Sequence, residues 1–124
     1  MTLFWVGLGG AIGSMARHGF NRLIHQRALG STFPLGIFLI NILGSVVIGM
    51  IAGLLASGRM HLSYQARTFV VVGVLGGFTT FSSFSLDTLT LLREGQLGYA
   101  MVNVLGQVTL SLVGVWIGFR VTGG

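Results

Sequence analysis

The chain has 124 residues, of which only 7% are charged and 52% are hydrophobic, and it contains no cysteine. A soluble domain carries about a quarter charged residues, so this composition excludes an ordinary soluble protein and also a disulfide framework. It predicts one membrane domain in lipid, with no room for a second. The net charge of +5 comes from scattered arginines without a basic stripe, which excludes nucleic acid as a partner.

Four segments are long and apolar enough to cross a membrane, for which a helix needs about 20 residues. We expect helices at about 3–24, 34–57, 68–92 and 97–119, joined by short polar loops. Long runs without two-residue alternation favour helices over barrel strands, the only other way to span lipid. The predicted fold class is therefore an all-α integral membrane protein. No basic region precedes the first apolar run, so we interpret this segment as a retained helix rather than a signal peptide.

Each predicted span contains two glycines four residues apart, which lie on one face of a helix. These pairs are Gly9/Gly13, Gly49/Gly53, Gly73/Gly77 and Gly114/Gly118. Glycine lets a neighbouring backbone approach closely, and helices pack in this way where lipid removes the hydrophobic driving force. We interpret all four pairs as packing positions rather than ligand sites.

Polar residues in the first two spans have two interpretations each. Arg17 either extends to the headgroups or lies at the mouth of an aqueous vestibule, where it would concentrate anions. Asn41 lies in the middle of the second span. Its amide could direct two N–H groups at an anion, or it could form a hydrogen bond between helices.

The third span contains GGFTTFSSFS at residues 76–85, where glycines and hydroxyls interrupt an apolar run. A membrane helix breaks only where its freed backbone groups meet protein, water or an ion. Gly76 and Gly77 would ease a break, and the freed carbonyls could bind a hard cation such as sodium. The alternative is an unbroken helix whose Ser and Thr side chains bond back to their own carbonyls.

Phe81 and Phe84 are three residues apart, so they share a helix face. The electropositive edges of their rings could solvate a small anion weakly enough to let it pass, although such a pair more often only packs. Asp87 follows, either as a hydrogen-bond acceptor at the wet end of the span or as part of a proton relay. The fourth span carries three polar residues at intervals of four, which are Asn103, Gln107 and Ser111. They could donate hydrogen bonds to an anion or form hydrogen bonds between helices.

Arginines near the span ends are almost evenly divided between the two sides of the membrane. Four lie on one side and three on the other: Arg17, Arg22, Arg27 and Arg93 against Arg59, Arg67 and Arg120. Because positive residues set orientation, this balance predicts insertion both ways and an antiparallel homodimer. The alternative is one orientation, set by the positions of the arginines rather than by their number.

Several segments together resemble the Fluc (CrcB-type) family of fluoride ion channels, over essentially the whole chain. They are GGAIGSMAR at 9–17, PLGIFLINILGS at 34–45, GVLGGFTTFSSFSLDT at 73–88 and REGQLGYAMVNVLGQ at 93–107. The third of these is the most specific. The resemblance implies a channel that exports cytoplasmic fluoride passively through the bacterial inner membrane and so reduces fluoride toxicity.

The resemblance also implies an antiparallel, dual-topology homodimer with a broken third helix, two fluoride pores and a structural sodium ion at its centre. Backbone carbonyls of Gly76 and Thr79 would bind the sodium, and Arg17 would lie at the vestibule. The expected pore residues are Asn41, Phe81, Ser83, Phe84, Asn103 and Ser111. Asn103 occupies a position where some similar chains have tyrosine.

An enzyme is not predicted, because the sequence has no Walker-type loop and no nucleophile–base pair. The spacing of its three histidines also fits no zinc site. The alternative function is a small four-helix, proton-coupled multidrug exporter, which would need a carboxylate inside the membrane. A non-conducting assembly subunit is the other rival.

Overall fold

In the computed structural model, residues 1–27 and 32–123 are described, and they are almost entirely helical. The three long, uninterrupted helices are α1 (Thr2–Arg27), α2 (Leu35–Ala56) and α6 (Leu97–Gly123). Between α2 and α6 the chain forms α3 (Tyr64–Arg67), the π-helical stretch η1 (Thr68–Leu75), α4 (Gly76–Phe78) and α5 (Phe81–Arg93). Residues 28–31 of the first predicted loop lie outside the described residues.

Of the described helical segments, three are long and apolar enough to cross a membrane: Leu35–Ala56, Tyr64–Arg93 and Leu97–Gly123. Helix α1 has 26 residues, which is also long enough, but polar side chains occupy its second half. Arg17, Asn21 and His25 are among them. Of the four predicted spans, the first is therefore the one that is not apolar enough, by composition alone, to be identified as a membrane span.

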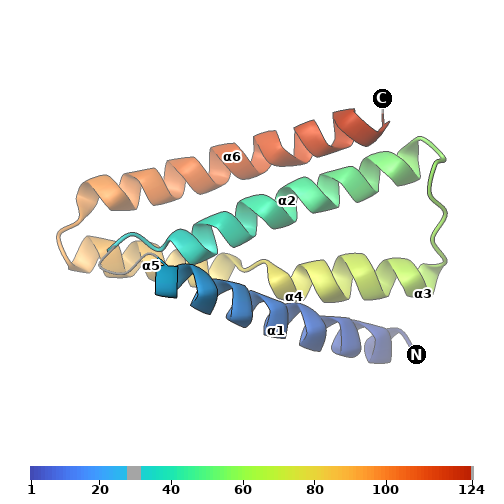
Figure 1. The fold of residues 1–124 in the computed structure, drawn as a ribbon, viewed down its shortest axis with the longest axis horizontal. Coiled ribbons are helices and arrows are strands. Elements are labelled where there is room, and N and C mark those ends of the chain that lie inside the picture. Colours follow the sequence, from blue (N-terminus) through green and yellow to red (C-terminus); the bar gives the residue numbers. More distant parts are fainter. Residues whose placement is uncertain (28–31, 124) are drawn as a thin grey trace.

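The helical segments lie side by side as two pairs (Figure 1). Helix α2 lies along α6, and α1 lies along η1 and α4. Helices α2 and α6 run in one direction, and α1 and the segment from α3 to α5 run in the other (Figure 1). Both termini and the connection between α2 and α3 consequently lie at the same end of the bundle.

Glycines at the predicted four-residue spacing lie at the contacts within both pairs. A Cβ atom on Gly73 would stand 2.9 Å from the Gly9 Cα, and one on Gly118 would stand 2.8 Å from the Met50 backbone nitrogen. Side chains cannot be accommodated at such distances without moving a helix. The predicted packing role of the glycine pairs is confirmed.

The fully buried apolar core is small. Its main cluster consists of Ile37, Ile40 and Phe84, with Phe20, Phe78 and Val104 packed against it, and Leu75, Leu91 and Ala100 are also buried. Large apolar side chains elsewhere are exposed, including Phe81 at 75% and Trp116 at 62%. Such a surface requires lipid or a second chain around it.

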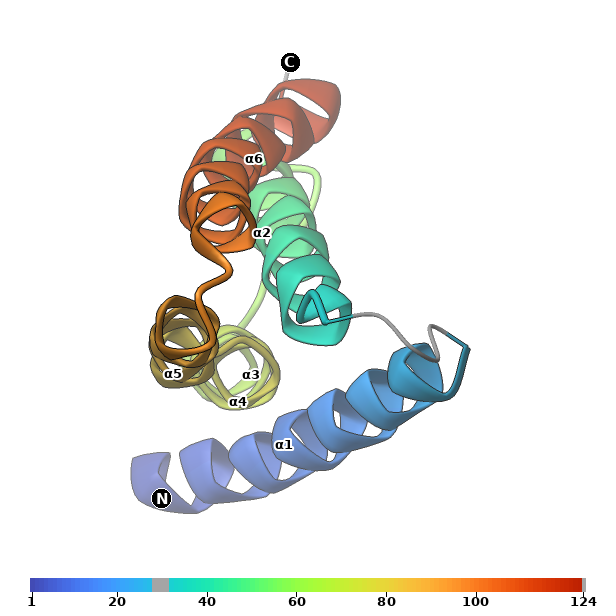
Figure 2. The same ribbon diagram turned by 90° about the vertical axis from the view of Figure 1, so that its left-hand side faces the viewer.

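The third segment leaves helical geometry at Thr79 and Thr80, which we call the interruption. Gly76 is helical, with φ −63° and ψ −36°. Thr79 (φ −87°, ψ 157°) and Thr80 (φ −155°, ψ 116°) are extended. Viewed along the bundle, the axis of α5 is displaced sideways from that of α3 and α4 (Figure 2). The chain thus departs from the helix after the two glycines rather than at them.

Candidate functional site

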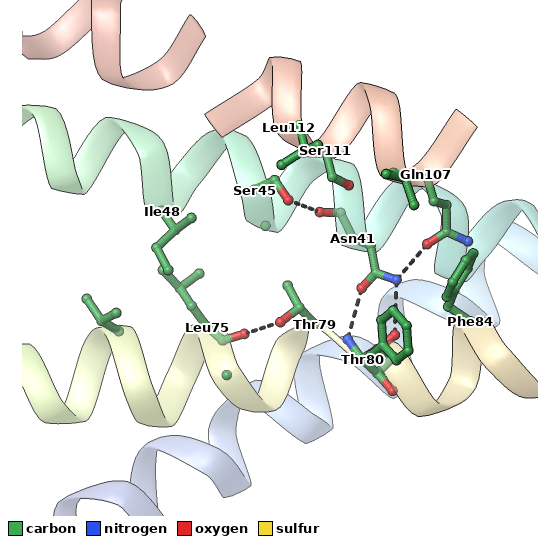
Figure 3. Close-up of a pocket in the computed structure, with 15 residues that line it drawn as sticks. Asn41, Ser45, Ile48, Leu75, Thr79, Thr80, Phe84, Gln107, Ser111 and Leu112 are labelled. Atoms are coloured by element: carbon green, nitrogen blue, oxygen red, sulfur yellow. Dashed lines mark hydrogen bonds between the residues drawn. The ribbon is translucent and has the colours of Figure 1, made fainter. Parts of the chain in front are cut away.

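Polar groups from α2, α6 and the third segment meet around a cavity of about 470 Å³, which we call the central cavity. Its polar lining comes from Asn41, Ser45, Thr79, Thr80, Gln107 and Ser111 (Figure 3). Apolar side chains, including Ile48, Leu75 and Leu112, complete the wall. Exposed Phe81 and exposed Gly76 also belong to the lining, so the cavity reaches the surface of the chain. A mostly apolar wall with a few converging polar groups is typical of a ligand site.

The side chain of Asn41 pairs with the backbone of Thr80 at the interruption. Its Oδ1 accepts from the Thr80 N–H at 2.9 Å, and its Nδ2 donates to the Thr80 carbonyl at 3.0 Å (Figure 3). A side-chain amide offers the same donor and acceptor as a peptide group. Asn41 therefore satisfies both backbone groups of one extended residue inside the bundle, where an unpaired group is costly.

The backbone carbonyls of the turn before the interruption lose their helical donors, and those of Gly76 and Thr79 are among them. In a continuous helix the Thr80 N–H would donate to the Gly76 carbonyl, but here it donates to Asn41. In a continuous helix the Ser83 N–H would donate to the Thr79 carbonyl, but here it donates to Thr80 Oγ1 at 3.1 Å. This bond makes Thr80 the N-cap of α5. Gly76 and Thr79 both line the central cavity. Carbonyl oxygens released in this way suit a hard monovalent cation.

The rings of Phe81 and Phe84 are in contact, with centroids 5.3 Å apart and planes inclined at 57°. This contact confirms that the two side chains share a face of α5. Phe84 is only 8% exposed, whereas Phe81 is 75% exposed in the single chain. Both line the central cavity, and their role toward an ion stays a prediction.

A line of hydrogen bonds, the amide relay, runs from Asn41 across α6 to α5. Asn41 Nδ2 donates to Gln107 Oε1 at 2.7 Å, and Gln107 Nε2 donates to Asn103 Oδ1 at 2.8 Å. Asn103 Nδ2 then donates to Thr88 Oγ1 at 3.0 Å, and Thr88 Oγ1 donates to the Phe84 carbonyl at 2.8 Å. Asn103 and Gln107 thus join helices, which is one of their two predicted roles. Asn41 does so as well, and its Nδ2 has two acceptors within the chain.

Three of the predicted site residues do not line the central cavity. Asn103 is fully buried and lies in the amide relay. Ser83 is half-buried in the first turn of α5. Arg17 is half-buried on α1, the helix that packs against η1 and α4. The central cavity therefore brings together the residues of the interruption, Asn41, both phenylalanines and Ser111.

Asp87 lines a second cavity, of about 360 Å³, together with Asn21, His25 and Glu94. Within the described part of the chain, Asp87 Oδ2 and Asn21 Oδ1 are buried without a hydrogen-bond partner. The second cavity is separate from the central one, since the two share no lining residue. Neither role considered for Asp87 is tested by this arrangement.

Two residues of the site were not singled out from the sequence. The Ser45 hydroxyl donates to the Asn41 carbonyl at 2.8 Å and lines the central cavity. Thr88 ends the amide relay. The signal that could have found them is spacing, because each follows a predicted site residue by one helical turn: Ser45 follows Asn41, and Thr88 follows Phe84.

Comparison with known proteins gives consistent matches along the chain. A family model described as "CrcB-like protein, Camphor Resistance (CrcB)" matches residues 4–119. A protein of Opitutus terrae named fluoride-specific ion channel FluC is 51% identical over 95% of this chain and 90% of its own length. A protein of Nitrobacter hamburgensis named fluoride-specific ion channel FluC 2 is 48% identical over 95% and 94%. A Thermus thermophilus protein, also named fluoride-specific ion channel FluC, is 46% identical over 95% and 92%.

Proposed function

The chain belongs to the CrcB-like family, and we propose that it exports fluoride from the bacterial cytoplasm passively, down the electrochemical gradient of the ion. It is a fluoride ion channel and not an enzyme. The observation that carries the assignment is its 46–51% identity, over 95% of the chain, to proteins named fluoride-specific ion channels. Hydrogen fluoride enters cells as a neutral molecule and dissociates inside, so a passive anion pathway is enough to reduce fluoride toxicity.

The working unit in this proposal is an antiparallel homodimer with two pores. Phe81 is 75% exposed in a single chain, and the central cavity reaches the chain surface beside it. A pathway lined by this ring therefore needs a second wall, which another copy of the chain would provide. The near balance of arginines between the two sides supports copies inserted in opposite directions.

A structural sodium ion at the dimer centre fits the residues present. The Gly76 and Thr79 carbonyls have lost their helical donors, and both residues line the central cavity. Two carbonyls from one chain are too few to replace the water around a cation. A two-fold axis beside the interruption would add the same two groups from the second copy.

For the fluoride pathway, we assign solvation of the ion to the ring edges of Phe81 and Phe84. Ring edges attract an anion weakly, and weak attraction allows the ion to leave as well as to enter. Asn41 holds the interruption beside this path. Ser111 is a further pore residue that lines the central cavity, Ser83 and Asn103 are proposed pore residues outside that cavity, and Arg17 concentrates anions at the vestibule.

The protein lies in the inner membrane as a multi-pass protein, and α1 crosses the membrane together with the three apolar spans. Helix α1 packs along η1 and α4, which belong to an apolar span, so it lies at the same depth in the bilayer. Its polar second half then faces the vestibule or the headgroups.

Fluoride efflux from liposomes tests the proposal. Purified protein is reconstituted into vesicles loaded with potassium fluoride, and efflux is followed with a fluoride electrode after valinomycin provides a potassium pathway. We expect rapid, voltage-driven fluoride efflux, almost no efflux from matched potassium chloride vesicles, and none from protein-free vesicles. Absence of fluoride flux would reject the channel. Slow, pH-coupled flux of an organic cation would instead identify a multidrug exporter.

A further inference from the structure

We infer that Gln107 is a positioning residue whose side-chain amide holds Asn41 and Phe84 in place beside the ion path. The inference rests on the proposed channel function. It assigns Gln107 a task that is separate from contact with the ion. Three observations carry it: the direction of the amide relay, the burial of its members, and the two points at which the relay holds α5.

The direction of the amide relay is set by the backbone of Thr80. Its N–H can only donate, so the Asn41 amide must present Oδ1 to it and Nδ2 to the Thr80 carbonyl. Nδ2 then also donates to Gln107, which must present Oε1. This leaves Gln107 Nε2 to donate to Asn103 Oδ1. Turning any one of these amides over would bring two donors or two acceptors together.

The members of the amide relay on α6 are buried, although Gln107 also lines the central cavity. Asn103 is 0% exposed and Gln107 is 4% exposed. At Asn103, which is fully enclosed and does not line the cavity, water cannot replace a lost partner, so a broken link there leaves a buried group unsatisfied. Removing the Gln107 amide would leave Asn103 Oδ1 without its donor and would take from Asn41 Nδ2 one of its two acceptors.

The amide relay holds α5 on both sides of Phe84. At one end Asn41 binds the backbone of Thr80, the residue that caps α5. At the other end Asn103 donates to Thr88, which in turn donates to the Phe84 carbonyl. Phe84 is four residues from each, so all three lie on nearly the same face of the segment. Phe84 and Gln107 both line the central cavity, as Figure 3 shows. Gln107 is the link by which α6 connects the two ends.

Only a side chain that accepts and donates at the same time, with this reach, completes the amide relay. Methionine has a similar length but no N–H and only a weak acceptor. Glutamate accepts from Asn41 but, when ionised, has no hydrogen for Asn103. Asparagine has both functions and is one methylene shorter, so it cannot reach both partners.

The test is fluoride efflux from liposomes by the full chain and by Gln107→Met. We expect the variant to assemble as the wild type does and its fluoride flux to fall about tenfold or more, because buried Asn103 Oδ1 loses its donor and Asn41 Nδ2 loses one of its two acceptors. We also expect a lower ratio of fluoride to chloride flux, since Asn41 and Phe84 are no longer fixed beside the path. A purely structural role would not change this ratio.

Thr122→Val is the matched control. The Thr122 hydroxyl donates to the Met50 carbonyl at 2.7 Å, so it also links α6 to α2 and is also buried, but it lies outside the amide relay. We expect wild-type flux and selectivity from this variant. Equal impairment of Thr122→Val and Gln107→Met would overturn the inference, because any weakened contact between these helices would then suffice.

Two further measurements cover the remaining outcomes. If Gln107→Met does not assemble, Gln107→Asn replaces it, and wild-type flux and selectivity from that variant overturn the inference. If the relay acts as a unit, Gln107→Met combined with Asn103→Leu costs less flux than the product of the two separate losses. Multiplicative losses count against it. Failure of the wild type to conduct rejects the channel itself, whereas a conducting wild type with an equally conducting and selective Gln107→Met rejects only the positioning role.

Discussion

At the scale of single residues, the site depends on how Thr80 is satisfied. Both of its backbone groups pair with the Asn41 amide, and its hydroxyl caps α5 through the Ser83 N–H. In the membrane interior a residue outside a helix needs such partners, because water is not available to supply them. One asparagine therefore makes the interruption possible and, by taking the Thr80 N–H, frees the carbonyl of Gly76, a residue that lines the central cavity.

The two phenylalanines provide the prediction at this scale. In Phe81→Ile and in Phe84→Ile the aromatic edge is lost while an apolar side chain remains, so we expect fluoride flux to fall about tenfold or more in each variant. Size-exclusion chromatography should show an unchanged assembly. Phe4→Ile is the control, since Phe4 is 58% exposed on α1 and lies outside the central cavity. Wild-type flux from both pore variants would contradict ring-edge solvation.

Only part of this residue-level arrangement can be predicted from the sequence. The contact between Phe81 and Phe84 follows from their spacing, which is local. The partners of Asn41 are not local, because Thr80 is 39 residues away and Gln107 is 66 residues away. The position of a polar residue in the middle of a predicted span indicated that Asn41 is important. That signal fits both an amide directed at an anion and a hydrogen bond between helices. Only the packing of the helices determines which acceptors receive hydrogen bonds from Asn41 Nδ2.

At the scale of helices, contacts with neighbouring helices determine where the third segment leaves helical geometry more than its own glycines do. Gly77 is held against α1, where a Cβ atom would stand 2.7 Å from the Gly10 carbonyl oxygen. Close packing uses the absence of a side chain there, and the backbone stays helical. The chain turns out of the helix at Thr79 and Thr80 because Asn41 offers partners at that level. The sequence thus predicted an interruption near this glycine pair, while its position was determined by a residue on another helix.

Alanine substitutions in α1 test the close packing of this helix. A Cβ atom on Gly13 would overlap the Val74 carbonyl oxygen and stand 2.8 Å from the Phe78 nitrogen, both of them backbone atoms that cannot rotate away. We expect Gly13→Ala to lower stability by about 1–3 kcal/mol, measured as a lower denaturation midpoint in detergent. A Cβ on Gly19, on the same helix, meets nothing within 4 Å, so Gly19→Ala should be neutral or slightly stabilising. Equal effects of the two changes would argue against close packing at Gly13.

At the scale of the whole molecule, the proposed channel is incomplete in a single chain. The central cavity reaches the surface beside an exposed phenylalanine, and one chain lines it with one copy each of Gly76 and Thr79, the residues proposed to bind the cation. The four-residue glycine spacing predicted close helix pairs, and both pairs form within the chain. That pattern therefore does not indicate how two copies meet. Arginine balance is the sequence feature that bears on the second copy, and its prediction can be tested directly.

Opposed orientation variants provide that test. Gln96→Lys with Gly98→Lys places two exposed charges on the side with four arginines, giving six basic residues against three. His61→Lys and Gln65→Lys, with Arg93→Gln, give five against three in the opposite sense. Basic residues near span ends are retained in the cytoplasm, so each variant should insert in one direction, as reported by a fusion at the C-terminus. If channels form from oppositely inserted copies, neither variant alone should protect a fluoride-sensitive bacterium, and the two expressed together should. A variant of single orientation that protects on its own would contradict antiparallel pairing, because it has no inverted partner to complete the central cavity.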